Sequence, residues 1–126
     1  MVCIMLVRKD SASLKGLELG LRKGGAIELV HVSSKKEALE SLEKSSIDVV
    51  VTDAELADVE PLSLVTELMQ KRPLINCAMV NSLSPEDFHE YTEGLGVFMQ
   101  LPLNPGEREA GKMLEILDSI DTLLKA

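Results

Sequence analysis

The feature that most constrains the fold is a regular alternation of short apolar runs with amphipathic segments. The five apolar runs lie at residues 2–7, 26–32, 47–52, 74–80 and 97–101. Continuous apolar runs of this length are typical of buried strands, whereas apolar residues spaced three or four apart are typical of helices that bury one face. Strands that alternate with helices predict a parallel sheet covered on both faces. We therefore expect an α/β protein with a doubly wound, five-stranded parallel sheet.

The segments between these runs carry the signals of helix ends. Helices are expected over 11–23, from Ser34, from near Leu62 to before Arg72, from Ser84, and from Asn104 onward. Two adjacent glycines end the first helix, and a serine followed by proline starts the fourth. No linker or low-complexity tract interrupts the pattern. The sequence therefore predicts one domain over residues 1–126.

Composition excludes several classes of protein. The net charge is −8 and aromatic residues make up 2%, so a phosphate-binding face and a base-stacking platform are both unexpected. Cys3 and Cys77 lie inside apolar runs, as expected for core thiols in a reducing compartment. No apolar stretch reaches the roughly 18 residues that a membrane span needs, and the N-terminus lacks the pattern of a signal peptide. We expect a cytoplasmic protein that binds neither nucleic acid nor membrane.

Ligands of doubly wound sheets bind at the carboxyl ends of the strands. Here those ends are residues 8–10, 33–34, 52–53, 81–82 and 101–102. Asp53 stands out, because it follows a run that should be buried on both faces. A carboxylate at that position either caps the next turn or takes part in chemistry.

Two stretches around these ends resemble the motifs of response-regulator receiver domains. Asp53 is followed by "AELADVEPL", and residues 94–103 read "GLGVFMQLPL", with Gly94, Phe98 and Pro102 in register with the family motif. The resemblance covers the whole chain. It implies a flavodoxin-like fold with five helices and strand order 2-1-3-4-5, with Asp53 at the position of the phosphoacceptor and Phe98 at that of the switch aromatic.

The resemblance also implies a phosphorylation pocket that this chain has altered. Family members hold Mg²⁺ with two acids after the first strand, and these positions are Arg8 and Lys9. The family's hydroxyl residue after strand four is Asn81, and its lysine after strand five is Leu101. Guanidinium and ammonium groups have no acceptor atoms and cannot bind a metal ion. We therefore expect no cofactor and no standard Mg²⁺-dependent phosphorylation.

The neighbouring acids leave two alternatives open. Asp10, Asp53 and a backbone carbonyl form a conceivable rebuilt metal site, whereas the plainer interpretation is that Asp10 caps the first helix and Glu55 faces water. Arg8 is a candidate to pair with Asp53 in place of the metal. The plainer interpretation is that Arg8 extends into solvent and Asp53 caps the following turn.

Three functions follow from these expectations. The first is a non-enzymatic signalling module, a degenerate receiver that binds a histidine kinase or an output protein as a monomer or weak homodimer. By analogy with the family, its contact face is formed by the fourth helix, fifth strand and fifth helix. The second is an active receiver that a histidine kinase phosphorylates on Asp53 with Mg²⁺. The third is a flavodoxin-like enzyme or nucleotide binder that uses residues 8–13, although no motif spacing supports it.

Overall fold

One parallel sheet organises the protein. The structure is a computed structural model that describes residues 2–10, 12–25 and 27–125, with side chains as far as residue 119. The strands are β1 (Val2–Val7), β2 (Ile27–Val32), β3 (Val49–Thr52), β4 (Asn76–Val80) and β5 (Val97–Leu101). They pair in parallel in the order β2-β1-β3-β4-β5. The predicted doubly wound sheet and its strand order are confirmed.

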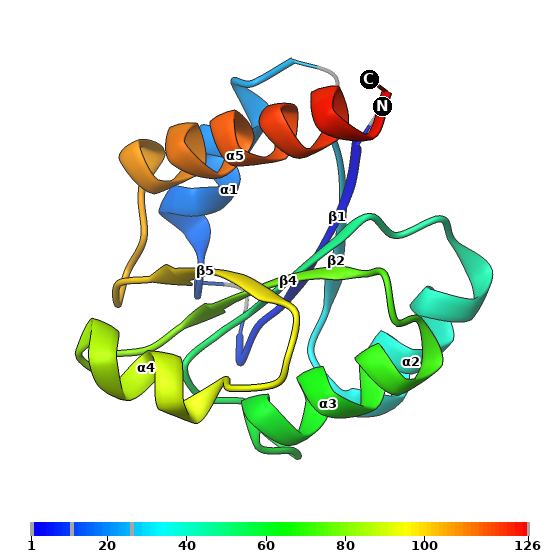
Figure 1. Ribbon diagram of the computed structural model, residues 1–126. Helices are drawn as coiled ribbons and strands as arrows, with labels where there is room; N and C mark the ends of the chain where they lie inside the picture. Colours follow the sequence, from blue (N-terminus) through cyan, green and yellow to red (C-terminus); the bar gives the residue numbers. More distant parts are fainter. Residues whose placement is uncertain (1, 11, 26, 126) are drawn as a thin grey trace.

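Helices cover both faces of the sheet, as Figure 1 shows. They are α1 (Lys15–Arg22), α2 (Lys35–Lys44), α3 (Pro61–Lys71), α4 (Pro85–Tyr91) and α5 (Glu107–Lys125). α1 and α5 pack on one face, and α2, α3 and α4 pack on the other. β3 lies between the two layers, and all four of its residues are fully buried, as its apolar run predicts. None of the described helices is long and apolar enough to cross a membrane.

Two helices start later than the sequence pattern predicts, for a local backbone reason. Ser11 lies outside the described residues, and α1 begins only at Lys15, because Leu14 has a φ of 64° that no helical residue adopts. Asn104 has a φ of 55°, so the last helix begins at Glu107 instead of at the Asn-Pro pair. Side-chain spacing carries no information about these left-handed residues.

Three strand starts also differ from the prediction. β3 begins at Val49 and not at Ile47, whose amide donates to the Ser45 carbonyl. Ala26 lies outside the described residues, and β2 begins at Ile27. β4 begins at Asn76, because the Ile75 amide donates to the Arg72 carbonyl in a turn. Leu74 is 93% exposed and belongs to that turn, although it continues the apolar run.

The contact between α1 and α5 depends on a glycine. A Cβ atom at Gly20 would lie 2.7 Å from the Cβ of Ala110 and 2.8 Å from the Cα of Glu107. Only a residue without a side chain allows this approach. The distance explains a glycine inside a helix, where it costs about 1 kcal/mol relative to alanine.

We expect Gly20→Ala to lower the free energy of unfolding by about 2 kcal/mol, because overpacking outweighs the gain in helix propensity. The matched control is Gly111→Ala in α5, where a Cβ would meet no atom within 4 Å. That change should leave stability unaltered or raise it by up to about 1 kcal/mol. Urea unfolding of both variants measures the difference, and equal effects would show that the close helix contact is not required.

Candidate functional site at the carboxyl ends of the strands

Asp53 lies directly after β3 and caps the chain that leaves it. Its amide donates to the Val7 carbonyl at 2.9 Å, which extends the pairing of β1 and β3. Its carboxylate accepts hydrogen bonds from the amide of Ala54 at 2.8 Å and from that of Lys9 at 3.4 Å. The interpretation of Asp53 as a turn cap is confirmed, and its half-buried carboxylate is held by backbone N–H groups.

Arg8 does not pair with Asp53, so that prediction is wrong. Its Nη1 donates to Oε1 of Glu18 on α1 at 3.0 Å and to the Ser13 carbonyl at 3.4 Å. The side chain is 14% exposed, so the alternative of a solvent-extended arginine is wrong as well. The physical reason is Glu18: a carboxylate that is 8% exposed needs a cation, and Arg8 is within reach.

Two further side chains lie close to the buried carboxylate of Glu18. Nε of Arg22 lies 3.3 Å from one oxygen, and Nε2 of His31 lies 3.7 Å from the other. Burial alone would raise the pKa of Glu18, but the hydrogen bonds from Arg8 and Arg22 bring that pKa below its ordinary value. Burial and the nearby charge of Arg8 lower the pKa of His31. The carboxylate is therefore held ionised mainly by the two arginines.

Sequence reasoning missed Glu18, although a signal was present. The residue lies next to Leu17 and one turn from Leu14 and Leu21, on the apolar stripe that α1 buries. An acid beside the buried stripe of an amphipathic helix needs a positive partner, and the chain supplies one at the end of β1.

Lys9 and Glu55 form an exposed ion pair beside Asp53. Nζ of Lys9 lies 3.3 Å from Oε2 of Glu55, and the two side chains are 55% and 78% exposed. Glu55 faces water, as expected. A pair this exposed contributes little to stability, so both side chains are free to exchange partners.

Asp10 closes a turn before α1. Its Oδ1 accepts from the amides of Ala12 and Ser13 at 2.9 and 3.0 Å and from the Ser13 hydroxyl at 3.2 Å. These bonds lower the pKa of Asp10, the Ser13 amide contributing most. The prediction that Asp10 caps the first helix is wrong, because Leu14 is the N-cap residue of α1; Asp10 caps the turn that precedes it. The amides of Ala12 and Ser13 are thereby occupied, which argues against a nucleotide-binding role for residues 8–13.

Asn81 is tied to the neighbouring strand by Gln100. Nε2 of Gln100 donates to Oδ1 of Asn81 at 2.8 Å and to the Leu83 carbonyl at 2.7 Å. The Leu83 amide also donates to Oδ1 of Asn81, at 3.2 Å. Within the described part of the chain, the buried Nδ2 of Asn81 and the buried Oγ1 of Thr52 have no hydrogen-bond partner.

Leu101 lies in the core and not in a pocket. It is 0% exposed and packs with the layer that contains α1 and α5. A β-bulge in β5 precedes it: Cys77 pairs with Val97 and Ala78 with Met99, so Phe98 has no residue opposite it. Phe98 is half-buried against the same layer. The bulge was not predictable from the apolar run.

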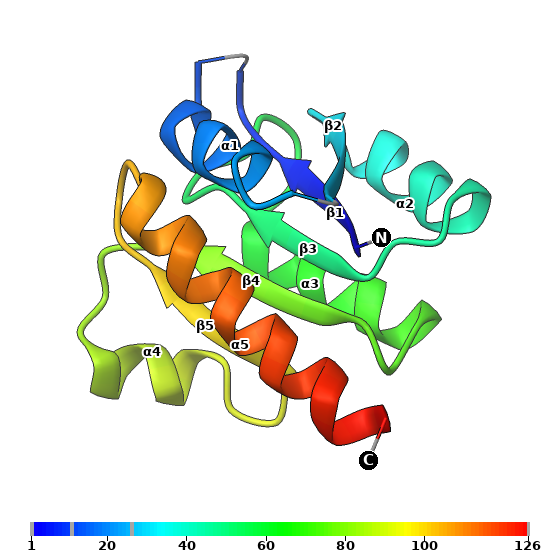
Figure 2. The same ribbon diagram turned by 90° about the horizontal axis from the view of Figure 1, so that it is seen from above.

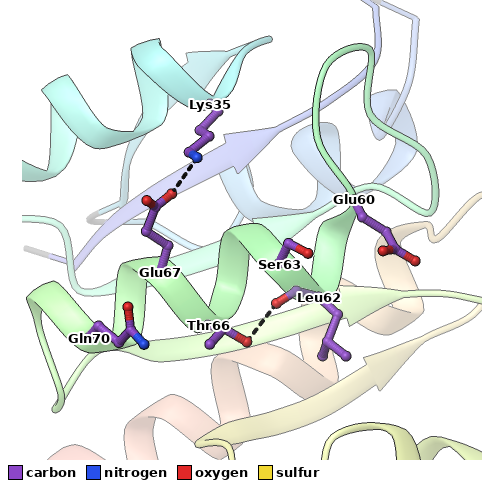
Figure 3. A pocket seen from close by; sticks show the side chains of 7 residues that line it. All are labelled: Lys35, Glu60, Leu62, Ser63, Thr66, Glu67 and Gln70. Carbon is purple, nitrogen blue, oxygen red and sulfur yellow. Dashed lines mark hydrogen bonds and ion pairs between the residues drawn. The ribbon is translucent and has the colours of Figure 1, made fainter.

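Hollows lie on the surface of the described residues, and one of about 460 Å³ is lined by Leu83 and Leu103. A second of about 410 Å³ opens beside the end of β3, and Asn81, Leu83, Tyr91 and Leu103 are among the residues that line it. Another of about 370 Å³ lies over α3 (Figure 3). There Lys35 is paired with Glu67 at 3.0 Å, and the Thr66 hydroxyl donates to the carbonyl of its own helix. No nucleophile with an adjacent base lines the hollow over α3.

No metal-binding cluster is present in the part of the chain that the structure describes. No group of three or more His, Cys, Asp or Glu side chains there could hold a metal ion. Asp53 has Lys9 and Glu55 nearby, while Asp10 is engaged in its own turn. The donor set therefore does not fit the Mg²⁺ site that the resemblance implies.

Comparisons with known proteins bear on the fold of this chain. No family model matches the sequence. A stretch of 82 residues, 64% of the chain, is 32% identical to protein-glutamate methylesterase/protein-glutamine glutaminase 1 of Rhodospirillum rubrum, and it spans 21% of that protein's length. This chain therefore corresponds to about a fifth of that relative.

Solved structures of receiver domains superpose on nearly the whole chain. The response regulator receiver domain of Methanospirillum hungatei matches with a TM-score of 0.81, 21% identity and coverage of 97% of this chain and 98% of its own. That of Clostridium thermocellum matches with a TM-score of 0.81, 20% identity and coverage of 98% and 99%. A putative response regulator of Chloroflexus aurantiacus gives a TM-score of 0.77 at 20% identity, covering 90% and 94%. The protein has the fold of response-regulator receiver domains, as the resemblance predicts.

Proposed function

We propose that this chain is a receiver-type signalling module of the two-component kind that acts by binding protein partners, without Mg²⁺-dependent phosphorylation of Asp53. The observation that carries the proposal is the position of Arg8. It stands where receiver domains carry a metal-binding acid, and its guanidinium is bound to the buried Glu18. A cation held there by an ion pair repels a divalent metal and offers it no ligand.

The groups that would bind a phosphoryl oxygen support the same proposal. The side chain at the lysine position is Leu101, which is fully buried and apolar. The side chain at the hydroxyl position is Asn81, which lacks the family's hydroxyl; its Oδ1 accepts from Gln100, and only its Nδ2 could donate to a phosphoryl oxygen. Phosphoryl transfer to Asp53 requires its negative charge to be neutralised, and Lys9, whose backbone amide contacts Asp53, has its ammonium group paired with Glu55.

The proposed module is not an enzyme and works in the cytoplasm. Its partners would be a histidine kinase or an output protein, bound at the face formed by α4, β5 and α5. The family analogy suggests that face, and the hollows beside Leu83 and Leu103 support it. An active receiver phosphorylated on Asp53 is the competing function, because Asp53 is retained at the end of β3.

We expect no change in the amide NMR spectrum around Asp53 when millimolar Mg²⁺ and then beryllofluoride are added. Beryllofluoride mimics an aspartyl phosphate but needs both the carboxylate and a metal ion. The response should be equally absent from the Asp53→Asn variant.

A gain-of-function variant provides the positive control for the absence of amide shifts. Lys9 is exposed, so Lys9→Asp should fold normally and place a second carboxylate beside Asp53. We expect this variant to acquire a weak Mg²⁺-dependent shift at Ala54 and its neighbours, because two carboxylates attract the ion while the charge of Arg8 is partly balanced by Glu18. If the unaltered protein responds to beryllofluoride and Asp53→Asn does not, the pocket is active and the proposal is wrong.

A further inference from the structure

Positive charge is missing from one long stretch of the chain. None of the 13 lysines and arginines lies between Arg72 and Arg108. The charged residues in that stretch are all acids that are exposed to solvent, namely Glu86, Asp87, Glu90, Glu93 and Glu107. Four of them belong to α4 or closely follow it, whereas Glu107 is paired with Lys23, so the charged side chains on and next to α4 are all acids.

A groove adjoins this acidic helix. It has a volume of about 460 Å³ and lies between the loop that leads from β4 into α4 and the loop that leaves β5; Asn81, Leu83, Pro85, Gln100, Pro102 and Leu103 line it. Leu83 is 39% and Leu103 52% exposed, and they are two of the four exposed large apolar side chains among the described residues. Exposed leucines around a hollow are typical of a protein-binding surface.

The strand beside the groove has an open edge without charge. β5 is the last strand of the sheet and lies between α4 and α5, as Figure 2 shows. Its residues Val97–Leu101 include no charged side chain, and four of the five are half-buried. Unpaired strand edges are ordinarily protected by charged residues or proline. An edge without them is suited to contact with another chain.

The groove is held in shape by hydrogen bonds of its own. Gln100 donates to both Asn81 and Leu83, which fixes the β4–α4 loop against β5. A preformed surface loses less conformational freedom when a partner binds. Nδ2 of Asn81 is a buried donor without a partner in the described part of the chain, at the wall of this groove.

Resting on the proposed function, we propose that this groove binds a basic segment of the protein partner. An apolar side chain of that segment would contact Leu83 and Leu103, and its lysines or arginines would face the acids of α4. Charge complementarity determines the sign of the partner's charge, because the acids of α4 would repel an acidic segment.

The test uses two synthetic 12-residue peptides with the same leucines, one with lysine and arginine at all other positions and one with glutamate. We expect the basic peptide to shift amides within residues 81–87 and 97–103 of the labelled protein, with an affinity that falls about tenfold between 50 and 300 mM salt. The acidic peptide should cause no shifts.

Matched variants separate a local site from a general attraction to an acidic protein. Leu103→Ala should weaken binding of the basic peptide about tenfold, as for an anchor residue. Glu86→Gln/Glu90→Gln should weaken it several-fold, whereas Glu40→Gln/Glu43→Gln on α2 removes the same charge and should leave the affinity unchanged.

Equal effects of the two double variants, or shifts that lie on α2 and α3, would overturn the inference, and so would equal binding of both peptides. These outcomes are independent of the beryllofluoride experiment. If neither beryllofluoride nor the basic peptide causes shifts, the proposed function stands and only the inference of a basic partner segment is refuted.

Discussion

Replacing Arg8 with alanine is expected to lower the free energy of unfolding by about 3 kcal/mol, because the change leaves the buried carboxylate of Glu18 without its best partner. The matched control is Arg22→Ala. Arg22 also contacts Glu18, but its side chain is 58% exposed, so this loss should cost about 0.5 kcal/mol. Urea unfolding at pH 7 measures both.

The pH dependence of this difference has a definite sign. In the unaltered protein the pKa of Glu18 lies below its ordinary value of 4.5, so the ion pair stabilises the fold above that pH and is lost as the pH falls through the lowered pKa. Without Arg8, a main cause of the lowered pKa of Glu18 is removed, while burial still acts to raise that pKa. The cost of Arg8→Ala should therefore shrink when the pH falls below about 4.5.

Two further results bear on the Arg8 prediction. The double variant Arg8→Met/Glu18→Leu removes both charges and should recover most of the lost stability, since no unpaired charge remains. If Arg8→Ala costs no more than Arg22→Ala, Arg8 is not held by Glu18 and remains available to Asp53. The observation that carries the proposed function would then fail.

Leu101→Ala is expected to lower the free energy of unfolding by about 3 kcal/mol, the usual cost of removing a fully buried leucine side chain. Leu103→Ala, two residues further along, is the control: that side chain is 52% exposed and its loss should change stability by less than about 0.5 kcal/mol. Thermal unfolding monitored by circular dichroism distinguishes the two.

The leucine comparison tests whether Leu101, the last residue of β5, has a structural role. A small effect of Leu101→Ala would mean that the side chain at the family's lysine position lies outside the core, where a cation could replace it. A large effect would agree with a side chain at position 101 that packs in the core and does not bind a phosphoryl group. Leu103→Ala, which keeps stability, can then be used in the peptide experiment without concern for folding.

The sequence by itself determined the architecture, because the spacing of its apolar residues indicates which positions are buried. Apolar runs of five to seven residues that alternate with amphipathic helices predict a covered parallel sheet, and β3 is the fully buried strand that its run predicts. The polar residues that end these runs located the candidate site, and Asp53 lies where they indicate. The sequence also shows that Arg8 and Lys9 occupy the two positions at which the family carries acids.

The tertiary structure alone decided which side chains meet, since these contacts join residues that the sequence separates. Arg8 binds Glu18 instead of Asp53, because a buried carboxylate from another element competes for it. The bulge at Phe98 and the left-handed backbone of Leu14 are single-residue conformations, to which side-chain periodicity is insensitive. Gly20 is required by a close approach of α1 to α5 that exists only once both helices have packed on the same face of the sheet.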